Sequence, residues 1–351
     1  DGVAMTKISE RRYGELLEHL PVIDLDVKIL GKKNKYWRKW IAHPTNDAYW
    51  RRASFSHKLK KVRLPVFHQS GWFDGDGIGS KLNYLQMRKH KHPHQKLVLG
   101  PWGHTARATR SHGGRDFGPA AVIDLQHQYL RWFDRWLKGV SNGIDTEPLV
   151  KIFVMGTNRW LSGNEYPLKG TKHEKWYLAS GGRANTSKGD GALTRKRPSA
   201  RSKADRYVYD PGDPTPDPRF WTSPKRKKGQ VLSGDKLKAA AEAHHARVIA
   251  RRKDILVYTS PPMPKPYTFA GPLPAVLYAA SSAKDTDWFV RLSEVNTKGR
   301  IFVLGQGKIR ARFRRSMRKP TFLRKNRVYK YVLDLWQTGI TVPAKARLWV
   351  V

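Results

Sequence analysis

The sequence predicts an α/β region followed by an all-β sandwich of the jelly-roll type. A strand, a helix and a second strand follow one another between residues 61 and 99, and short strand-like runs recur from Leu149 onward. Of the 351 residues, 39% are hydrophobic, which is enough apolar material for the cores of two domains.

The α/β region contains a βαβ pattern. The segment 61–69 (KVRLPVFHQ) is typical of a short buried strand, residues 78–87 place apolar side chains at helical spacing, and 96–99 form a second apolar run. This order over about 40 residues indicates a parallel sheet with a right-handed crossover.

A longer helix is predicted over residues 120–138. Its apolar residues recur at steps of three and four, which predicts an amphipathic helix packed on the sheet. These residues are Val122, Leu125, Tyr129, Trp132, Phe133 and Trp136. A loop over 139–148 ends this helix. We therefore predict two domains, residues 1–145 and 146–351.

The second domain shows many short β-type runs separated by Gly, Pro, Asn and Asp, which is typical of a sandwich or jelly roll. The runs are VKIFVMG, KWYLAS, RYVYD, DILVYTS, PAVLYAA, DWFVRLSEV, RIFVLG and YKYVLDLW. A basic insertion near 219–252 interrupts them. Within it, residues 235–252 lack a wide apolar stripe, so we expect a solvated helix on a loop.

The charge of the chain is unusual. Lys and Arg number 68 against 28 Asp and Glu, giving a net charge of +40, and most of the excess lies after residue 150. Basic runs at 225–228, 251–253 and 310–319 suggest an alternative function, a nonspecific nucleic-acid or polyanion binding protein that acts through counterion release. The sequence has no helix-turn-helix, zinc-finger or RNA-binding aromatic motif, and the run KIRARFRR also fits the outward face of a strand.

Several classes of protein and site are disfavoured. No run of about 18 apolar residues occurs, so we expect no membrane partner. The absence of cysteine excludes disulfides, thiolate zinc sites and a cysteine nucleophile. Two groups of residues could be taken for metal ligands. A solvated turn explains His90, His92 and His94 better, and a strand-entry turn explains Asp285 and Asp287 better. We therefore predict neither a metal nor a cofactor.

Asp74 and His104 are the residues best suited to catalysis. Asp74 follows the first predicted strand in GWFDG, and His104 follows the second in GPWGH. In open α/β sheets ligands bind beyond the carboxyl ends of the strands. A carboxylate that holds one nitrogen of an imidazole lets the other nitrogen accept a proton from a serine hydroxyl. The alternative is that Asp74 caps a helix and His104 is an ordinary loop residue.

Motifs through most of the chain resemble one group of serine hydrolases. WRKWIAHPTNDAYW, GWFDG, LVLGPWGH, DFGPAA, LRWFDRWLKG, VKIFVMGTNRW, LASGGRAN, SSAKDTDWFVRL and VLDLWQTG are similar to segments of the cocaine esterase, X-prolyl dipeptidyl-peptidase and α-amino-acid ester hydrolase group. The resemblance implies a partial α/β-hydrolase sheet followed by a jelly-roll β-sandwich. It also implies that Asp74 is the orienting acid and His104 the general base of a Ser-Asp-His triad.

The chain departs from this group at the nucleophile. No G-x-S-x-G or similar elbow is present, and Ser80 comes after Asp74, in the wrong order. The resemblance is therefore to the C-terminal portion of a hydrolase of small esters, amides or peptides, whose serine is not in this chain. Trp72, Phe73 and Trp102 flank the two motifs, and either line an acyl pocket or pack the end of the sheet. Lys345 and the run 324–327 replace expected turn glycines.

Overall fold

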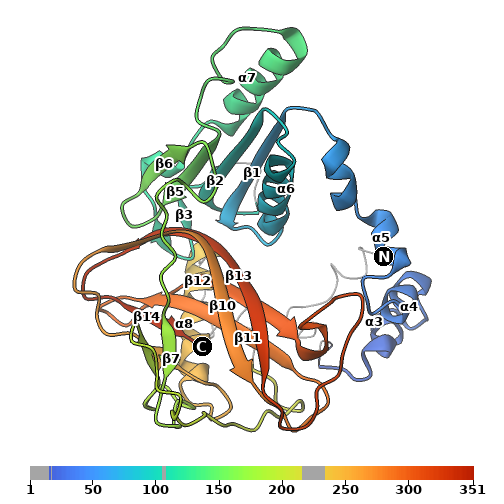
Figure 1. Cartoon of the computed structure of the whole chain (residues 1–351), viewed down its shortest axis with the longest axis vertical. Coiled ribbons are helices and arrows are strands. Elements are labelled where there is room, and N and C mark those ends of the chain that lie inside the picture. The colour runs from blue at the N-terminus through green and yellow to red at the C-terminus, as the bar shows by residue number, and fades with distance from the viewer. Residues whose placement is uncertain (1–15, 17, 105–107, 216–233) are drawn as a thin grey trace, which may run out of the picture.

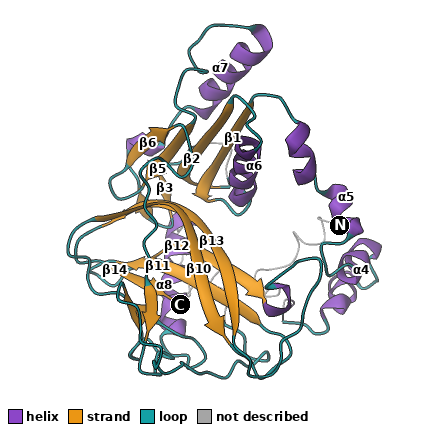
Figure 2. Cartoon of the chain, viewed as in Figure 1, coloured by secondary structure: helices purple, strands orange, loops and turns teal. Residues whose placement is uncertain are grey.

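The computed structural model describes residues 16, 18–104, 108–215 and 234–351 (Figure 1). A small sheet with two helices lies above a larger β-sandwich, and short helices near the N-terminus lie to one side (Figures 1 and 2). The N-terminal elements are η1 (Val22–Asp24), α3 (Leu25–Leu30), α4 (Lys35–Ala42), α5 (Ala48–Ala53) and η2 (Ser56–Lys61). None of the helices described is long and apolar enough to cross a membrane.

The first sheet contains the predicted βαβ unit, whose first strand lies at the edge of the sheet. Its four strands are ordered β1 (Val66–Phe73), β2 (Gln95–Gly103), β5 (Val150–Val154) and β6 (Arg159–Gly163), and α6 (Gly77–Lys89) connects β1 to β2. β1 and β2 are parallel, as the sequence predicts. β1 begins after Pro65 because proline has no N–H for the ladder, and it ends directly before Asp74.

Helices cover opposite faces of this sheet. Phe67 of β1 packs edge-on against Tyr129 and Trp132 of α7 (Leu125–Lys138), with ring centroids 5.7 and 5.5 Å away. The next residue, His68, packs against Tyr84 of α6 at 5.7 Å. Since neighbouring side chains on a strand point to opposite faces, α6 and α7 sandwich the sheet between them.

α7 starts five residues after its predicted beginning. Pro119–Ala121 forms a separate 3₁₀ turn, η3, and the Asp124 carboxylate accepts a hydrogen bond from His127 N at 2.9 Å. Asp124 therefore caps the helix and fixes its first residue. Gly139 ends it in the left-handed conformation, with φ of 74°.

The first sheet extends past the predicted boundary at 145/146 by two strands. β5 pairs in parallel with β2, Leu97 opposite Val150 and Leu99 opposite Ile152, and β6 pairs with β5. The first sheet thus continues to Gly163. The run VKIFV fits an inner strand of either domain, because an inner strand of a parallel sheet is buried on both faces and shows no alternation.

The β-sandwich packs a two-stranded sheet, β10 (Tyr267–Ala279) and β13 (Tyr329–Val342), on a six-stranded sheet. Along β13, Tyr331, Leu333 and Leu335 are buried while Val332 is exposed, and these inward residues form a second core. The six strands, in spatial order, are β12 (Ile301–Arg310), β11 (Asp287–Val295), β14 (Arg347–Val350), β9 (Tyr258–Thr259), β8 (Ala192–Thr194) and β7 (Tyr177–Ala179).

Two predictions for the sandwich are wrong. The run RYVYD at 206–210 forms no strand. Its neighbour Asp205 instead accepts hydrogen bonds from Ser180, Ala184 N and Tyr258, so the segment is held by a side chain rather than by a ladder. The predicted solvated helix is α8 (Gly234–Ile249), but its end packs into the sandwich, where Ile249 contacts the cluster of Val257 and Trp349.

Each of the two segments in which turn glycines are expected contains a residue with a left-handed backbone. Asn326 and Lys345 have φ of 60° and 66°, in the left-handed region. Lysine pays a steric cost there that glycine does not, as expected from the sequence.

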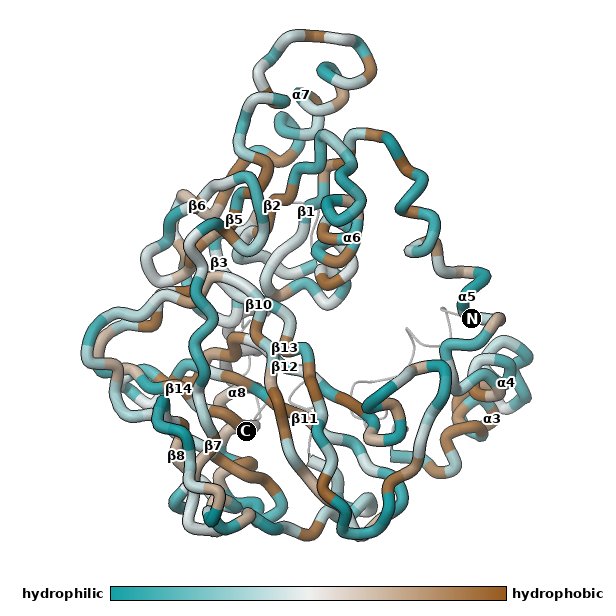
Figure 3. The backbone as a smooth tube through the Cα atoms, in the orientation of Figure 1, coloured by the Kyte–Doolittle hydropathy of each residue, from teal (hydrophilic) through white to brown (hydrophobic). Residues whose placement is uncertain are grey.

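The sheet and the sandwich share one continuous core. Met155 N donates to Gly339 O at 2.8 Å, and Thr341 N donates to Met155 O at 2.7 Å, so Met155, just beyond the end of β5, pairs in parallel with Ile340 of β13. Trp72 of β1 donates its indole N–H to Phe153 O at 2.8 Å. The hydrophobic stretches of both parts are brown in Figure 3.

Gly71→Ala is expected to destabilise the protein by about 1–3 kcal/mol, as overpacked cores do. A Cβ at residue 71 would lie 2.1 Å from Trp102 O, because β1 and β2 approach closely there. Urea unfolding would measure the loss. Gly79→Ala is the matched control: its Cβ meets nothing within 4 Å and the residue lies in α6, so alanine should stabilise by up to about 1 kcal/mol. Equal effects at the two positions would contradict this account.

Candidate active site

The structure brings Asp74 and His104 together. β1 ends at Phe73 and β2 at Gly103, and these two residues are partners in the parallel register. The next residue on each strand is therefore delivered to the same edge of the sheet. His104 Nδ1 lies 3.1 Å from Asp74 Oδ1, within hydrogen-bonding distance.

The Asp74 carboxylate has further partners in its own loop. Ser70 Oγ donates to Asp74 Oδ2 at 2.9 Å, and Asp76 N donates to Oδ1 at 3.0 Å. Partial burial by itself would raise the pKa of Asp74, but the hydrogen bonds from Asp76 N–H, Ser70 and His104 outweigh it and lower the pKa below its usual value. Asp74 is thus held as a carboxylate in a fixed orientation.

The alternative that Asp74 caps a helix does not describe this geometry. α6 begins at Gly77, and Asp76 precedes it without a side-chain capping bond. The carboxylate of Asp74 accepts from Asp76 N, ahead of the helix, and otherwise faces Ser70 and His104.

His104 projects into solvent. Its side chain is 79% exposed, against 16% for Asp74. Asp76 Oδ2 lies 3.6 Å from His104 Nδ1 and is itself 87% exposed. Asp74, Asp76 and His104 are the only group of three potential ligand residues found among the described residues. Asp74 already accepts hydrogen bonds at both oxygens, which suits an acid–base pair, and exposed carboxylates alone do not establish a metal site.

The aromatic residues beside the two motifs pack the sheet end. Trp72 is 5% exposed and bonded to Phe153 O. Trp102 is 1% exposed and donates to Ala121 O at 2.8 Å. Both indoles are therefore core residues, which favours packing over the acyl-pocket interpretation. Phe73 is half-buried and stacks on His112, with ring centroids 4.2 Å apart.

Ser80 does not reach the pair. Its hydroxyl donates to Gln69 O at 3.2 Å, on the side of α6 that faces β1. Among the described residues, the partners of the His104 ring are Asp74 and Asp76, and no serine lies where a nucleophile would donate its hydroxyl proton to this ring.

The other candidate metal ligands have structural partners. His92 is not in a solvated turn as expected: it is 1% exposed and its ring nitrogens lie 2.9 Å from Leu59 O and 2.7 Å from Arg63 Nη1. Asp285 and Asp287 pair with Arg312 and Arg310.

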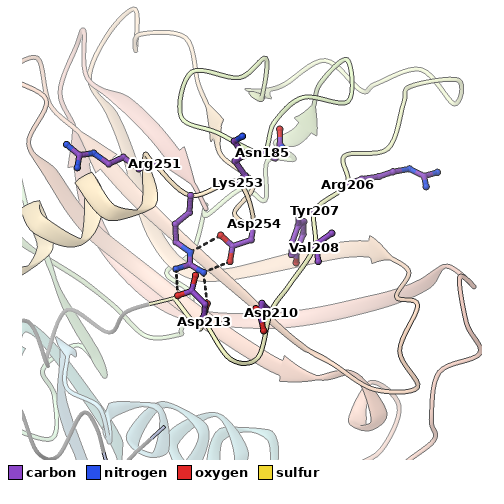
Figure 4. A pocket seen from close by; sticks show the side chains of 10 residues that line it. Asn185, Arg206, Tyr207, Val208, Asp210, Asp213, Arg251, Lys253 and Asp254 are labelled. Atoms are coloured by element: carbon purple, nitrogen blue, oxygen red, sulfur yellow. Dashed lines mark hydrogen bonds and ion pairs between the residues drawn. The ribbon is translucent and has the colours of Figure 1, made fainter.

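The basic runs are partly neutralised within the chain. Arg310 and Arg312 belong to these ion pairs, and Arg252 binds Asp213 and Asp254 beside a hollow of about 600 Å³ (Figure 4). Residues 225–228 lie outside the described residues. Polyanion binding stays a prediction.

Three residues of the site were not singled out from the sequence. Ser70 and Asp76 hold the Asp74 carboxylate, and His112 stacks on Phe73. Asp76 was visible in the motif as GWFDGDG, two residues after the acid. His112 comes from a hairpin that no sequence pattern connects to Phe73.

Comparisons with known proteins agree with the fold. The sequence matches the profile of the X-Pro dipeptidyl-peptidase C-terminal non-catalytic domain over residues 142–351, and that of X-Pro dipeptidyl-peptidase (S15 family) over residues 10–106. It is 32% identical over 302 residues to cocaine esterase of Rhodococcus sp. (strain MB1 Bresler), covering 85% of this chain and 50% of that protein.

Solved structures give the same result. A crystal structure of an aminopeptidase from a marine-sediment Thaumarchaeota archaeon matches with a TM-score of 0.76 and 25% identity, over 97% of this chain and 56% of that one. An α-amino acid ester hydrolase shares the fold, with a TM-score of 0.70 and 22% identity, over 93% and 54%. The chain thus spans about half the length of these relatives.

Proposed function

The chain belongs to the family of the X-Pro dipeptidyl-peptidase C-terminal non-catalytic domain over residues 142–351, and it matches the S15 family over residues 10–106. We propose that it forms the acid–base part of a serine hydrolase that acts on esters or amides. His104 is the general base, and Asp74 orients it. The nucleophilic serine comes from sequence outside residues 1–351. The substrates are small esters, amides or peptides, including Xaa-Pro peptides and α-amino acyl compounds.

In this mechanism Asp74 accepts the Nδ1–H of His104, which leaves Nε2 as the basic nitrogen. Nε2 removes the proton from the serine hydroxyl while the serine oxygen attacks the acyl carbon. The imidazolium then donates that proton to the departing alkoxide or amine. Water attacks the acyl-enzyme with the same nitrogen as base, and release of the acid restores the serine.

The 3.1 Å contact between His104 Nδ1 and Asp74 Oδ1 is the observation that carries this proposal. Its direction matters as much as its length, since it is Nδ1 that faces the acid. The exposure of His104 also supports the proposal, because a general base needs an open side where a nucleophile can approach.

The unpaired edge of the first sheet supports a nucleophile supplied from outside. β1 is a largely buried strand at the edge of the order β1-β2-β5-β6, and no described strand pairs with its other side. α7 exposes an apolar stripe at helical spacing, made of Leu130, Phe133 and Leu137. Parallel sheets are normally covered and extended on such sides, so a further strand and helix fit here.

A serine-reactive fluorophosphonate probe tests the source of the nucleophile. The 351-residue chain alone is expected to remain unlabelled. The complete enzyme, in which these residues are joined to the nucleophile-bearing sequence, is expected to be labelled on a serine outside them. Labelling of a serine within the present chain, located by mass spectrometry, would contradict the assignment, as would a complete enzyme that does not react.

A further inference from the structure

A short hairpin links the candidate active site to the sandwich. It consists of β3 (Ser111–His112) and β4 (Arg115–Asp116), which pair across the turn Gly113–Gly114. Arg110 closes its base by binding Asp116 through two nitrogens, at 2.8 Å each. The hairpin follows His104 in the chain, after residues that the structure does not describe.

One side of the hairpin supports both strand ends that carry the site. The His112 ring stacks on Phe73, the residue before Asp74, at 4.2 Å and an interplanar angle of 3°. The same ring lies against Gly103, the residue before His104: a Cβ on Gly103 would be 3.4 Å from His112 Cε1. His112 therefore stacks on the residue before Asp74 and lies beside the residue before His104.

The other side of the hairpin is fastened to the sandwich. Arg115 binds both oxygens of Glu294 of β11, at 2.7 and 3.0 Å, and its guanidinium lies 4.3 Å from the ring centroid of Phe302 of β12. Arg300 donates to the carbonyls of Gly113 and Gly114, at 3.2 and 3.1 Å. Phe302 also meets Phe73 edge-on at 5.5 Å.

The Arg115–Glu294 pair is well suited to fix a position. The Glu294 side chain is 1% exposed, so it must be paired to remain buried as a charge. A two-pronged guanidinium–carboxylate contact sets both distance and angle. Arg115 pairs with His112 in the hairpin, with only Gly113 and Gly114 between them, so fixing the position of Arg115 also fixes His112.

We propose that the sandwich positions the Asp74–His104 pair through this hairpin, with Glu294 and Arg115 as positioning residues. The inference rests on the proposed function for its catalytic meaning. In this inference the domain described as non-catalytic in this family has a defined role. It holds the base and its orienting acid in the correct relative position. Misplacement of reacting groups by about 1 Å lowers rates by up to about 100-fold.

The test compares Glu294→Gln and Arg115→Lys with Asp287→Asn. Glu294→Gln keeps the size of its side chain and Arg115→Lys keeps the charge of its side chain, but both lose the two-pronged pair. Asp287→Asn breaks the Arg310–Asp287 pair, which is also two-pronged and lies at the other end of β11, away from the hairpin. Arg115→Lys keeps the buried Glu294 neutralised, so it provides a readout if Glu294→Gln fails to fold.

In the complete enzyme, Glu294→Gln and Arg115→Lys are expected to lower kcat for an ester by about 10- to 100-fold with little change in KM, while Asp287→Asn leaves kcat unchanged. In the chain alone, amide hydrogen exchange should quicken in residues 108–118 and also in 71–77, which Glu294 does not contact. A purely local structural role would change exchange only around Glu294 and Arg115.

The outcomes separate this inference from the proposed function. If His104→Ala abolishes activity but Glu294→Gln and Arg115→Lys match Asp287→Asn in kcat and in exchange at 71–77, the positioning role is overturned and the hydrolase assignment stands. If His104→Ala leaves activity intact, the general-base assignment of His104 fails, and faster exchange at 71–77 would still support the mechanical link.

Discussion

His104→Ala in the complete enzyme is expected to lower kcat for a p-nitrophenyl ester by about 10⁶, the loss seen when the base of a serine triad is removed from subtilisin. The imidazole is the only described group positioned by Asp74 to take a proton. Without it the serine hydroxyl attacks at its ordinary reactivity, and the leaving group departs unprotonated. Release of p-nitrophenolate, followed by absorbance under substrate saturation, measures the change.

The fold should be unaffected by this substitution. The His104 side chain is 79% exposed, so removing it leaves no cavity. Thermal unfolding of the variant should coincide with that of the wild type. His127→Ala is a suitable control because His127 is an exposed histidine of α7, and it should retain full activity. Turnover by the His104 variant at the rate of this control would remove the general-base assignment.

Asp74→Asn is expected to lower kcat by about 10⁴, as the equivalent change does in the chymotrypsin-type triad. An amide can present its NH₂ to Nδ1, which favours the tautomer with the proton on Nε2 and so blocks proton transfer from serine. Steady-state kinetics on the same ester would show the loss. The matched control is Asp76→Asn: Asp76 is 87% exposed and 3.6 Å from Nδ1, so its effect should be far smaller.

Asp74 also gives stability a defined pH dependence. Its pKa is lowered in the folded state, because hydrogen bonds outweigh the effect of burial. The stabilising contribution is therefore present above the unfolded value of about 3.9 and is lost as the pH falls through the lower folded value. The stability difference between wild type and Asp74→Asn should shrink below about pH 4. A difference that grew in acid would mean that Asp74 is not held as a carboxylate.

The local sequence pattern was sufficient to predict that the two residues of the candidate pair lie close together. A buried run followed by Asp74, a helix, and a second run followed by His104 define a βαβ unit whose strand ends lie together, and the structure has this arrangement. The run YKYVLDLW was likewise predicted as a strand, and it forms the first part of β13.

Features that depend on distant partners were not accessible from the sequence. Val150–Val154 has no alternation that would assign it to either sheet, and only its pairing with β2 shows that it joins the first one. His92 is buried because Leu59 O and Arg63 lie beside it, some thirty residues earlier. The contact of Glu294 with Arg115 spans 179 positions, and nothing in either local sequence indicates it.

The junction at Met155 has a practical consequence for dividing the molecule. Met155, just after β5, exchanges backbone hydrogen bonds with β13, and the two segments share apolar neighbours. Cutting the chain between residues 140 and 149 would therefore remove β5 and β6 from the first sheet and expose a hydrophobic end on the other fragment. A fragment intended for expression should instead keep everything from Val66 to the C-terminal strand together, as one cooperative folding unit.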